Sequence, residues 1–413
     1  MLRPFQRLTL AACLAATAVA VLSADASGGQ RRQAASATAR AAGAETTFAL
    51  SLLDRLAPVG GNVIYSPYSI DVALAMADAG AAGQTAAQID RVLAAPSHAA
   101  ASADAAALVQ ALAAARGSEP GAPTLRSADA LWTQTGLALE HPFVATLGEF
   151  GAPPRSTDFA AAPQTALAAI NAWVAAHTSG LIPALLGPGA VSSQTAFVLA
   201  NAIYLKAHWS SPFAPSLTAP GPFHLTGGQV VRVPFMHQQD TTYGYAQGNG
   251  YQAVDLPYRS STLSLLAILP HGSLAGFEHS LNADTLAAVV TALKPHAVTL
   301  AMPKIDLSSQ IDLDQPLELL GMRDAFGPAA DFSALTRQRA LNISLVEHAA
   351  VLKVDEQGTV AAGATAIVGP TAVERPPVGV VTVAFDHPFL LVLRDDASGT
   401  ILFVARVADP SRS

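Results

Sequence analysis

Cysteine is almost absent from this chain. The 413 residues include one cysteine, Cys13, close to the start of the sequence. A single thiol cannot form an intramolecular disulfide, and it cannot supply the paired cysteines of a structural zinc site. Stability must therefore come from a hydrophobic core, which a chain of this length with 51% hydrophobic residues can build.

Charged residues are also few. They make up 13% of the chain, the formal net charge is -7, and no basic stripe is visible. Nucleic acid is therefore not an expected partner. The hydrophobic content excludes a disordered chain, the length allows one large domain or two, and no internal repeat is found.

Common catalytic motifs are missing. The sequence has no GxSxG elbow, no HExxH motif and no P-loop. His208, His348 and His387 each lie beside an apolar run, and we interpret them as hydrogen-bonded structural side chains. Asp312 and Asp314 fit the acidic start of a helix better than a metal site. The residues alone indicate no active site, and we expect no metal and no cofactor.

The N-terminus has the pattern of a secretory signal peptide. Arg3 and Arg7 precede an apolar run over residues 8–22, and Ala24-Asp25-Ala26 forms an A-x-A cleavage site. We therefore predict a signal peptide over residues 1–26 and a secreted protein, extracellular or periplasmic. Residues 10–13, LAAC, also resemble a lipoprotein cleavage box, but the apolar run continues beyond Cys13, which favours plain secretion.

The rest of the chain is expected to form one domain. Residues 27–43 are rich in Ala, Ser, Gly and Arg and are predicted to be a flexible linker, with the domain covering residues 44–413. No later apolar run is long enough to span a bilayer, so no membrane span is expected.

Helical patterns dominate the first half of the chain and strand patterns the second. NVIYSPYSIDVALAMADAG reads as a strand followed by a helix, with Ser66 as N-cap and Pro67 in the first turn. Capping explains Ser66 without a nucleophilic role. The apolar run from Thr195 to Trp209 is typical of a strand buried on both faces. This order of elements predicts an α+β fold.

An uncharged segment near the C-terminus combines two contradictory patterns. Residues 359–373 carry no charge and are mostly small, as in a buried strand. They lead into Glu374-Arg375-Pro376-Pro377, which reads as exposed, extended chain. The segment therefore has features of a core strand and of a surface loop.

Six stretches, in order along the chain, resemble the serpin family. They are NVIYSPYSI, FVLANAIYLKAHWSSPF, LPYRSSTLSLLAILP, LAMPKIDLSSQIDL, ADFSAL with HAAVLKVDEQGTVAAGATA, and FDHPFLLVL with ILFVARVADP. The resemblance covers nearly all of residues 45–410. It implies a serpin fold with three β-sheets, eight or nine helices and an exposed reactive-centre loop at about residues 356–377.

The resemblance also implies a function, namely suicide inhibition of serine proteases. The target protease attacks the loop, an acyl-enzyme forms, and the loop inserts into the main sheet before hydrolysis is complete. Counting from Glu356 places the reactive bond at Ala372-Val373, which suits a protease with a small primary pocket, elastase-like or subtilisin-like. Arg375 would indicate a trypsin-like target, but Pro376 follows it.

Family positions carry over onto two further groups of residues. The hinge of the loop is expected at Glu356, Gly358, Thr359, Ala361, Ala362, Gly363 and Ala364. The shutter and breach, which control opening of the main sheet, are expected at Ser66, Ser69, Asn201, Trp209 and His348. A buried strand must carry no unpaired charge, and the hinge meets that demand.

Two expectations concern single hinge residues. We expect Gly358 to provide backbone freedom where the chain folds over. We expect Thr359 to be exposed before cleavage, so that an arginine there would cost almost nothing until the loop inserts.

Two other functions remain open at this point. One is a non-inhibitory serpin that acts as a binding protein, and the other is a hydrolase with an unrecognised site. The expected partner of an inhibitor is its target serine protease in a covalent complex, and the protein is expected to be a monomer.

Overall fold

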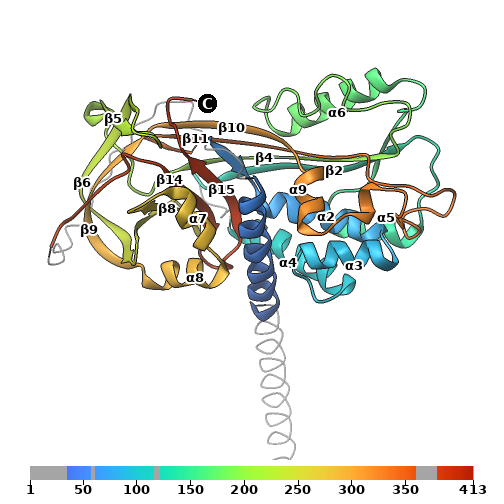
Figure 1. The fold of residues 1–413 in the computed structure, drawn as a ribbon, viewed down its shortest axis with the longest axis horizontal. Coiled ribbons are helices and arrows are strands. Elements are labelled where there is room, and N and C mark those ends of the chain that lie inside the picture. Colours follow the sequence, from blue (N-terminus) through green and yellow to red (C-terminus); the bar gives the residue numbers. More distant parts are fainter. Residues whose placement is uncertain (1–34, 57–60, 116–120, 360–378, 413) are drawn as a thin grey trace, which may run out of the picture.

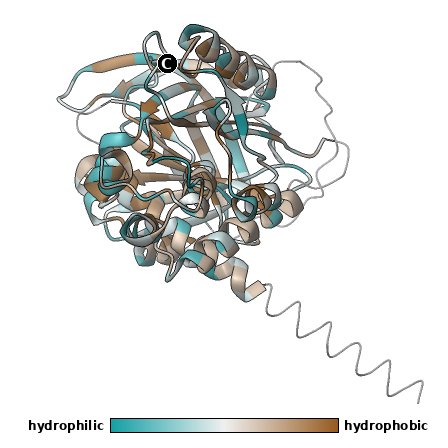
Figure 2. Ribbon diagram, turned by 90° about the vertical axis from the view of Figure 1, so that its right-hand side faces the viewer, coloured by the Kyte–Doolittle hydropathy of each residue, from teal (hydrophilic) through white to brown (hydrophobic). Residues whose placement is uncertain are grey.

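The computed structural model describes residues 35–56, 61–115, 121–359 and 379–412 (Figure 1). Within these ranges the chain forms two β-sheets and nine α-helices. Figure 2 shows the most apolar residues along the inner strands and the hydrophilic ones mainly at turns and helix surfaces. The α+β prediction is confirmed.

The first described helix covers residues 35–56, which corrects the predicted linker over residues 35–43, while residues 27–34 lie outside the described residues. Alanine and arginine are strong helix formers, and residues 27–43 are rich in both. Ala41 and Ala42 are buried, and Arg40 forms a 2.5 Å ion pair with Asp104. Tertiary contacts therefore begin inside the segment that composition alone assigned to a linker.

The remaining helices follow in chain order. They are α2 (Pro67–Gly80), α3 (Gly83–Val92), α4 (His98–Ala115), α5 (His141–Glu149), α6 (Pro163–His177), α7 (Leu274–Ser280), α8 (Ala283–Ala292) and α9 (Asp314–Leu320). Two 3-10 helices, η2 (Pro215–Leu217) and η3 (Asp324–Phe326), complete the set. The predicted N-cap of α2 is confirmed, because the Ser66 side chain accepts a hydrogen bond from the backbone N–H of Ser69.

The smaller sheet has six strands and crosses the width of the molecule (Figure 1). Their spatial order is β10 (Ile305–Asp312), β11 (Leu345–Asp355), β12 (Gly358–Thr359), β4 (Phe197–His208), β2 (Thr124–Gln134) and β3 (Arg155–Thr157). α6 packs on one face, where its residues share a cluster with alternate residues of β4, and α2 lies under the other face. β4 is therefore buried on both faces, as its apolar run predicts.

The larger sheet has nine strands. They are β1 (Val63–Tyr65), β5 (Ala219–His224), β6 (Val230–Gly248), β7 (Tyr251–Pro257), β8 (Leu263–Pro270), β9 (Lys294–Pro303), β13 (Val381–Ala384), β14 (Phe389–Asp395) and β15 (Ile401–Val407). The family resemblance predicts three sheets, whereas the described residues form two. The 19-residue β6 explains the difference, because its register shifts between Gln238 and Thr241 and one strand serves two parts of the sheet.

Candidate functional site

The two central strands of the smaller sheet are paired along only part of their length. β11 and β4 run parallel and pair directly from Leu345↔Val198 to Val351↔Tyr204. Beyond these residues they separate, and the two-residue strand β12 lies between them. β12 is antiparallel to both neighbours, with Thr359 opposite Ala207 on one side and Val354 on the other. The sheet is therefore open at one end, and the chain leading into the uncharged segment enters the opening.

Gly358 makes this entry possible. Its φ of 152° lies where L side chains are strained, and an added Cβ would come within 1.9 Å of the carbonyl oxygen of Ala207. Both backbone N–H groups of the preceding turn, Gln357 and Gly358, donate to Oδ1 of Asp355 at 2.8 and 3.2 Å. The expected backbone role of Gly358 is confirmed, and no other residue fits this position without displacing the sheet.

Thr359 is fully buried, which corrects the expectation that it is exposed before cleavage. Its hydroxyl is hydrogen-bonded to the hydroxyl of Tyr258. Tyr258 stacks on Trp209, with ring centroids 4.6 Å apart and 11° between the planes. The side chain of Thr359 does face the core, as strand spacing predicts, but it is already inserted.

Trp209 fixes the turn that precedes β12. Its indole Nε1–H donates to the carbonyl oxygen of Asp355 at 2.9 Å, and its backbone N–H donates to that of Gln357 at 2.9 Å. Trp209 follows directly after β4, so it ties the turn to the end of that strand. The residue expected at the breach thus lies at the open end of the sheet.

Glu356 anchors the same turn to two other elements. Its carboxylate pairs with Lys304 Nζ at 2.9 Å and accepts a hydrogen bond from Thr218 Oγ1 at 2.7 Å. Burial alone would raise the pKa of this carboxyl, but these bonds outweigh it and hold the pKa below its usual value. A charged Glu356 therefore holds the base of the loop against the sheet at neutral pH.

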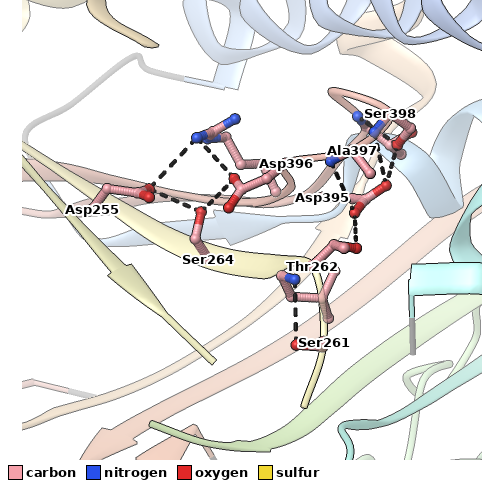
Figure 3. A network of polar contacts seen from close by, with 11 residues as sticks. Asp255, Ser261, Thr262, Ser264, Asp395, Asp396, Ala397 and Ser398 are labelled. Atoms are coloured by element: carbon pink, nitrogen blue, oxygen red, sulfur yellow. Dashed lines mark hydrogen bonds and ion pairs between the residues drawn. The ribbon is translucent and has the colours of Figure 1, made fainter. Parts of the chain in front are cut away.

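A polar network supports the turn that carries Tyr258 (Figure 3). Ser264 Oγ lies 2.8 Å from a carboxylate oxygen of Asp255 and 2.8 Å from one of Asp396, and Arg394 lies 2.8 Å from Asp396. The backbone N–H of Asp396 donates to the carbonyl oxygen of Thr262, which holds the end of β14 against this turn. These contacts hold the turn that carries Tyr258 against β14.

Four predicted residues form a second cluster where β11 and β4 are paired. Ser66 and Ser69 lie at the start of α2, Asn201 is on β4, and His348 stands opposite Asn201 on β11. Nε2 of His348 accepts from the backbone N–H of Ser66 at 3.0 Å, so Nδ1 carries the proton and donates to Oδ1 of Asn201. The amide of Asn201 donates to the carbonyl oxygen of Ser69 at 2.7 Å. One network therefore joins both strands to α2.

The electrostatics of this cluster depend on burial. Burial lowers the pKa of His348 to about 3, which keeps the imidazole neutral. A neutral ring can accept from one backbone N–H and donate to one amide oxygen, as observed here. Separating the strands would break the His348–Asn201 bond and leave Nδ1 of His348 and Oδ1 of Asn201 without this partner.

Asp129 belongs to this cluster and was not predicted. It lies on β2, accepts from Ser69 Oγ at 2.7 Å, and accepts from Asn201 Nδ2. Burial raises the pKa of Asp129 to about 6, although hydrogen bonds from Ser69, Ser127 and Asn201 oppose the rise. An available signal was that Asp129 is the one acidic residue in the apolar run SADALW. A cavity of about 150 Å³ lies beside it, lined in part by Arg155 and Trp173.

The other predicted residues fall into two groups. Ala361, Ala362, Gly363, Ala364, Ala372 and Val373 lie outside the described residues. Among the remaining candidates, His387 bonds to Asp386 and to the carbonyl oxygen of Pro270, both at 2.8 Å. Asp314 lies in the first turn of α9 and accepts from the backbone N–H of Val346 at 2.8 Å. Structural bonds account for both side chains.

Comparisons with known proteins agree on one family. Residues 43–410 match the family described as serpin, serine protease inhibitor. The chain is 35% identical to the leukocyte elastase inhibitor of Bos taurus over 89% of this chain and 98% of that protein. It is 32% identical to plasminogen activator inhibitor 1 of Neovison vison over 90% and 93%. The native structure of the thermophilic serpin tengpin matches with a TM-score of 0.80 and 26% identity, over 89% of this chain and 94% of that one.

Proposed function

The chain belongs to the serpin family, and we propose on that premise that it is a suicide inhibitor of serine proteases. The family description names protease inhibition, and two relatives of similar length carry inhibitor names. Members of such a family act mainly as inhibitors and not as catalysts. The proposal for this chain is that its segment after Thr359 is both the bait for the protease and a future strand of the sheet.

The observation that carries the proposal is the position of β12. Its two residues already pair with β4 and β11, antiparallel to both, at the open end of the sheet. A strand that continues in the same register can only advance between these two strands. The start of the loop is therefore aligned for insertion before any protease arrives.

The register predicts where each following residue would go. Thr359 lies opposite Ala207 and Val354, so Ala361 would lie opposite Leu205 and Leu352. Thr365 would reach the level of Asn201 and His348. Insertion must therefore replace the direct pairing of β11 with β4 and open the His348–Asn201 hydrogen bond.

The energy balance favours the inserted state. A strand of about ten residues that pairs on both sides forms more ladder bonds than the β11–β4 contact loses, and each bond contributes about 1 kcal/mol net. Ordering the loop offsets part of this gain. We propose that the added bonds, together with burial of the apolar side chains of the new strand, outweigh this ordering cost, so that insertion stabilises the cleaved form and can displace an attached protease.

The chemistry begins with the target enzyme. Its serine attacks the carbonyl carbon of Ala372, the bond to the nitrogen of Val373 breaks, and an acyl-enzyme forms. Once that bond is cut, the segment after Thr359 is free to enter the sheet and carries the acylated protease with it. A small residue at this bond fits a protease with a small primary pocket, elastase-like or subtilisin-like.

The proposed setting is outside the cytoplasm. The N-terminal signal pattern supports secretion, to the extracellular space or the periplasm, and the protein would act as a monomer. Within the described part of the chain, no helix is long and apolar enough to cross a membrane. The partner is the target protease, held in a covalent complex.

A reaction with purified proteases tests the proposal. The protein is incubated with an elastase-like, a subtilisin-like and a trypsin-like enzyme, and the products are separated under denaturing conditions. With an enzyme of the first two classes we expect a covalent band whose mass is the sum of both proteins less the released fragment that begins at Val373, and mass spectrometry should find cleavage after Ala372.

Two results would contradict the proposal. Cleaved protein together with fully active enzyme in every reaction would indicate a non-inhibitory member of the family. A covalent band with a new C-terminus at Arg375 would retain inhibition but shift the reactive bond and the target class.

A further inference from the structure

Three helix ends meet at one place far along the chain from the hinge. Asp78 lies in the last turn of α2, Asp90 in the last turn of α3, and His98 is the first residue of α4. One oxygen or nitrogen atom of each side chain lies within 4.8 Å of the others. Short connections join the three helices in sequence, so their relative positions are closely constrained.

Asp78 is completely buried and poorly compensated. Its Oδ2 lies 2.7 Å from Nδ1 of His98. Apart from this contact, neither Asp78 oxygen has a hydrogen-bond partner among the described residues, and neither has Oδ1 of Asp90. Among the described residues, no arginine or lysine lies within ion-pair distance of the carboxylate of Asp78 or of Asp90. Buried carboxylate oxygens in proteins are normally hydrogen-bonded, paired or bound to a metal.

The helices strengthen the negative potential at this place. The C-terminal turn of a helix carries a partial negative charge and favours cations. Both carboxylates nevertheless lie in such a turn. α2 has no basic residue in its last turn, whereas α3 has Arg91 there. The two acidic side chains and the uncompensated end of α2 therefore favour a bound cation.

We propose that Asp78, Asp90 and His98 bind a divalent transition-metal ion, with Zn²⁺ as the preferred ion. Zn²⁺ accepts imidazole nitrogen and carboxylate oxygen at about 2.0–2.2 Å, and three protein ligands leave a position for water. Mg²⁺ and Ca²⁺ prefer sites made of oxygen alone. The imidazole therefore selects against the commoner alkaline-earth ions.

Small movements would complete the site. Ligand atoms around a tetrahedral zinc lie about 3.4 Å apart, so His98 must move slightly away from Asp78. His98 can do so because it begins α4 and its side chain is 47% exposed. The same exposure gives the ion a route of entry. A bound ion would join α2, α3 and α4 at one point.

Zinc binding by the whole, untagged and chelator-treated protein tests the site. Calorimetric titration with ZnCl₂ should show one saturable site, and the ion should raise the melting temperature. His98→Ala should weaken binding at least tenfold and abolish the rise. His141→Ala is the matched control, because His141 is also exposed and also begins a helix, α5, and it should behave as the wild type.

Asp90→Asn provides an independent second variant with nearly unchanged shape. It should also weaken zinc binding at least tenfold, since an amide oxygen is a poorer zinc ligand than a carboxylate. The proposal is overturned if the wild type shows no saturable site at micromolar zinc. It is also overturned if His98→Ala and Asp90→Asn bind zinc as the wild type does.

Discussion

At the scale of single residues, the hinge depends on one glycine and one threonine. Gly358 is required because a Cβ would collide with the backbone of Ala207. Thr359 is fixed because its hydroxyl bonds to Tyr258, which is itself stacked on Trp209. These two residues hold β12 at the open end of the sheet.

Gly358→Ala should therefore disturb the hinge directly. The strained φ and the clash at 1.9 Å should push β12 out of the sheet and lower the free energy of unfolding by about 1–3 kcal/mol. Denaturant unfolding measures the effect. Gly272→Ala is the control, because nothing lies within 4 Å of its added Cβ. Equal unfolding midpoints for both variants would show that β12 does not contribute to the native fold.

Asp129 is also expected to make the free energy of unfolding depend on pH. Its pKa is raised to about 6 by burial, against 3.8 for the ordinary group, so the folded state binds the proton more tightly than the unfolded state. Both states are protonated below pH 3.8, and the folded state is penalised increasingly as pH rises to about 6. The wild type should therefore lose on the order of 2–3 kcal/mol relative to Asp129→Asn between pH 4 and 7.

Unfolding of both proteins across this pH range measures the difference. Asparagine keeps the shape and can still accept from Ser69 and Asn201, so a loss of structure is not expected at this site. Other buried acids titrate equally in both proteins and cancel in the comparison. Stability curves that stay parallel from pH 4 to 7 would contradict the assignment of Asp129 as a perturbed carboxyl.

At the scale of elements, the strand still to be inserted has two distinguishable faces. Ala361 would lie between Leu205 and Leu352, which are completely buried. Its neighbour Val360 would point the other way, beside the exposed Lys206 and Lys353. The same acidic side chain should therefore have opposite effects at adjacent positions.

Ala361→Glu should convert the inhibitor into a substrate. Burying an unpaired carboxylate between two leucines costs several kcal/mol and slows insertion, so water hydrolyses the acyl-enzyme first. Val360→Glu should still trap protease, since its carboxylate would lie near two lysines. The ratio of covalent complex to cleaved protein measures both. Equal trapping by the two variants would indicate that the loop does not enter in this register.

Local patterns predicted many of these elements but not their mutual contacts. The apolar run of β4 and the Ser66 cap of α2 could be recognised because neighbouring residues determine them. The early insertion of Thr359 could not, since it depends on Tyr258 and Ala207, which are far away in the sequence. The helix over residues 35–56 begins inside a segment whose composition suggests a linker. The composition does not show that Ala41 is buried against the domain, and this burial stabilises the helix.

Sites assembled from several elements were the hardest to predict. The shutter residues were assigned through a family resemblance, and Asp129 completes their network from a fourth element. Asp78, Asp90 and His98 come from three helices, and their spacing matches no metal motif. A single sequence does not show which helix ends meet in space.

At the scale of the whole molecule, the native sheet is incomplete. β11 and β4 pair directly over residues 345–351 of β11, and among the described residues Gly358 and Thr359 lie between these strands at their other end. We propose that the intact protein is metastable and that the segment after Thr359 completes the sheet once the loop is cut.

Thermal unfolding of intact and loop-cleaved protein tests this claim most directly. The loop is cut by a protease that the protein does not trap, and both forms are melted under the same conditions. We expect the cleaved form to melt at a clearly higher temperature than the intact form, because the inserted strand adds ladder bonds on both of its edges. Identical melting curves for the two forms would contradict it.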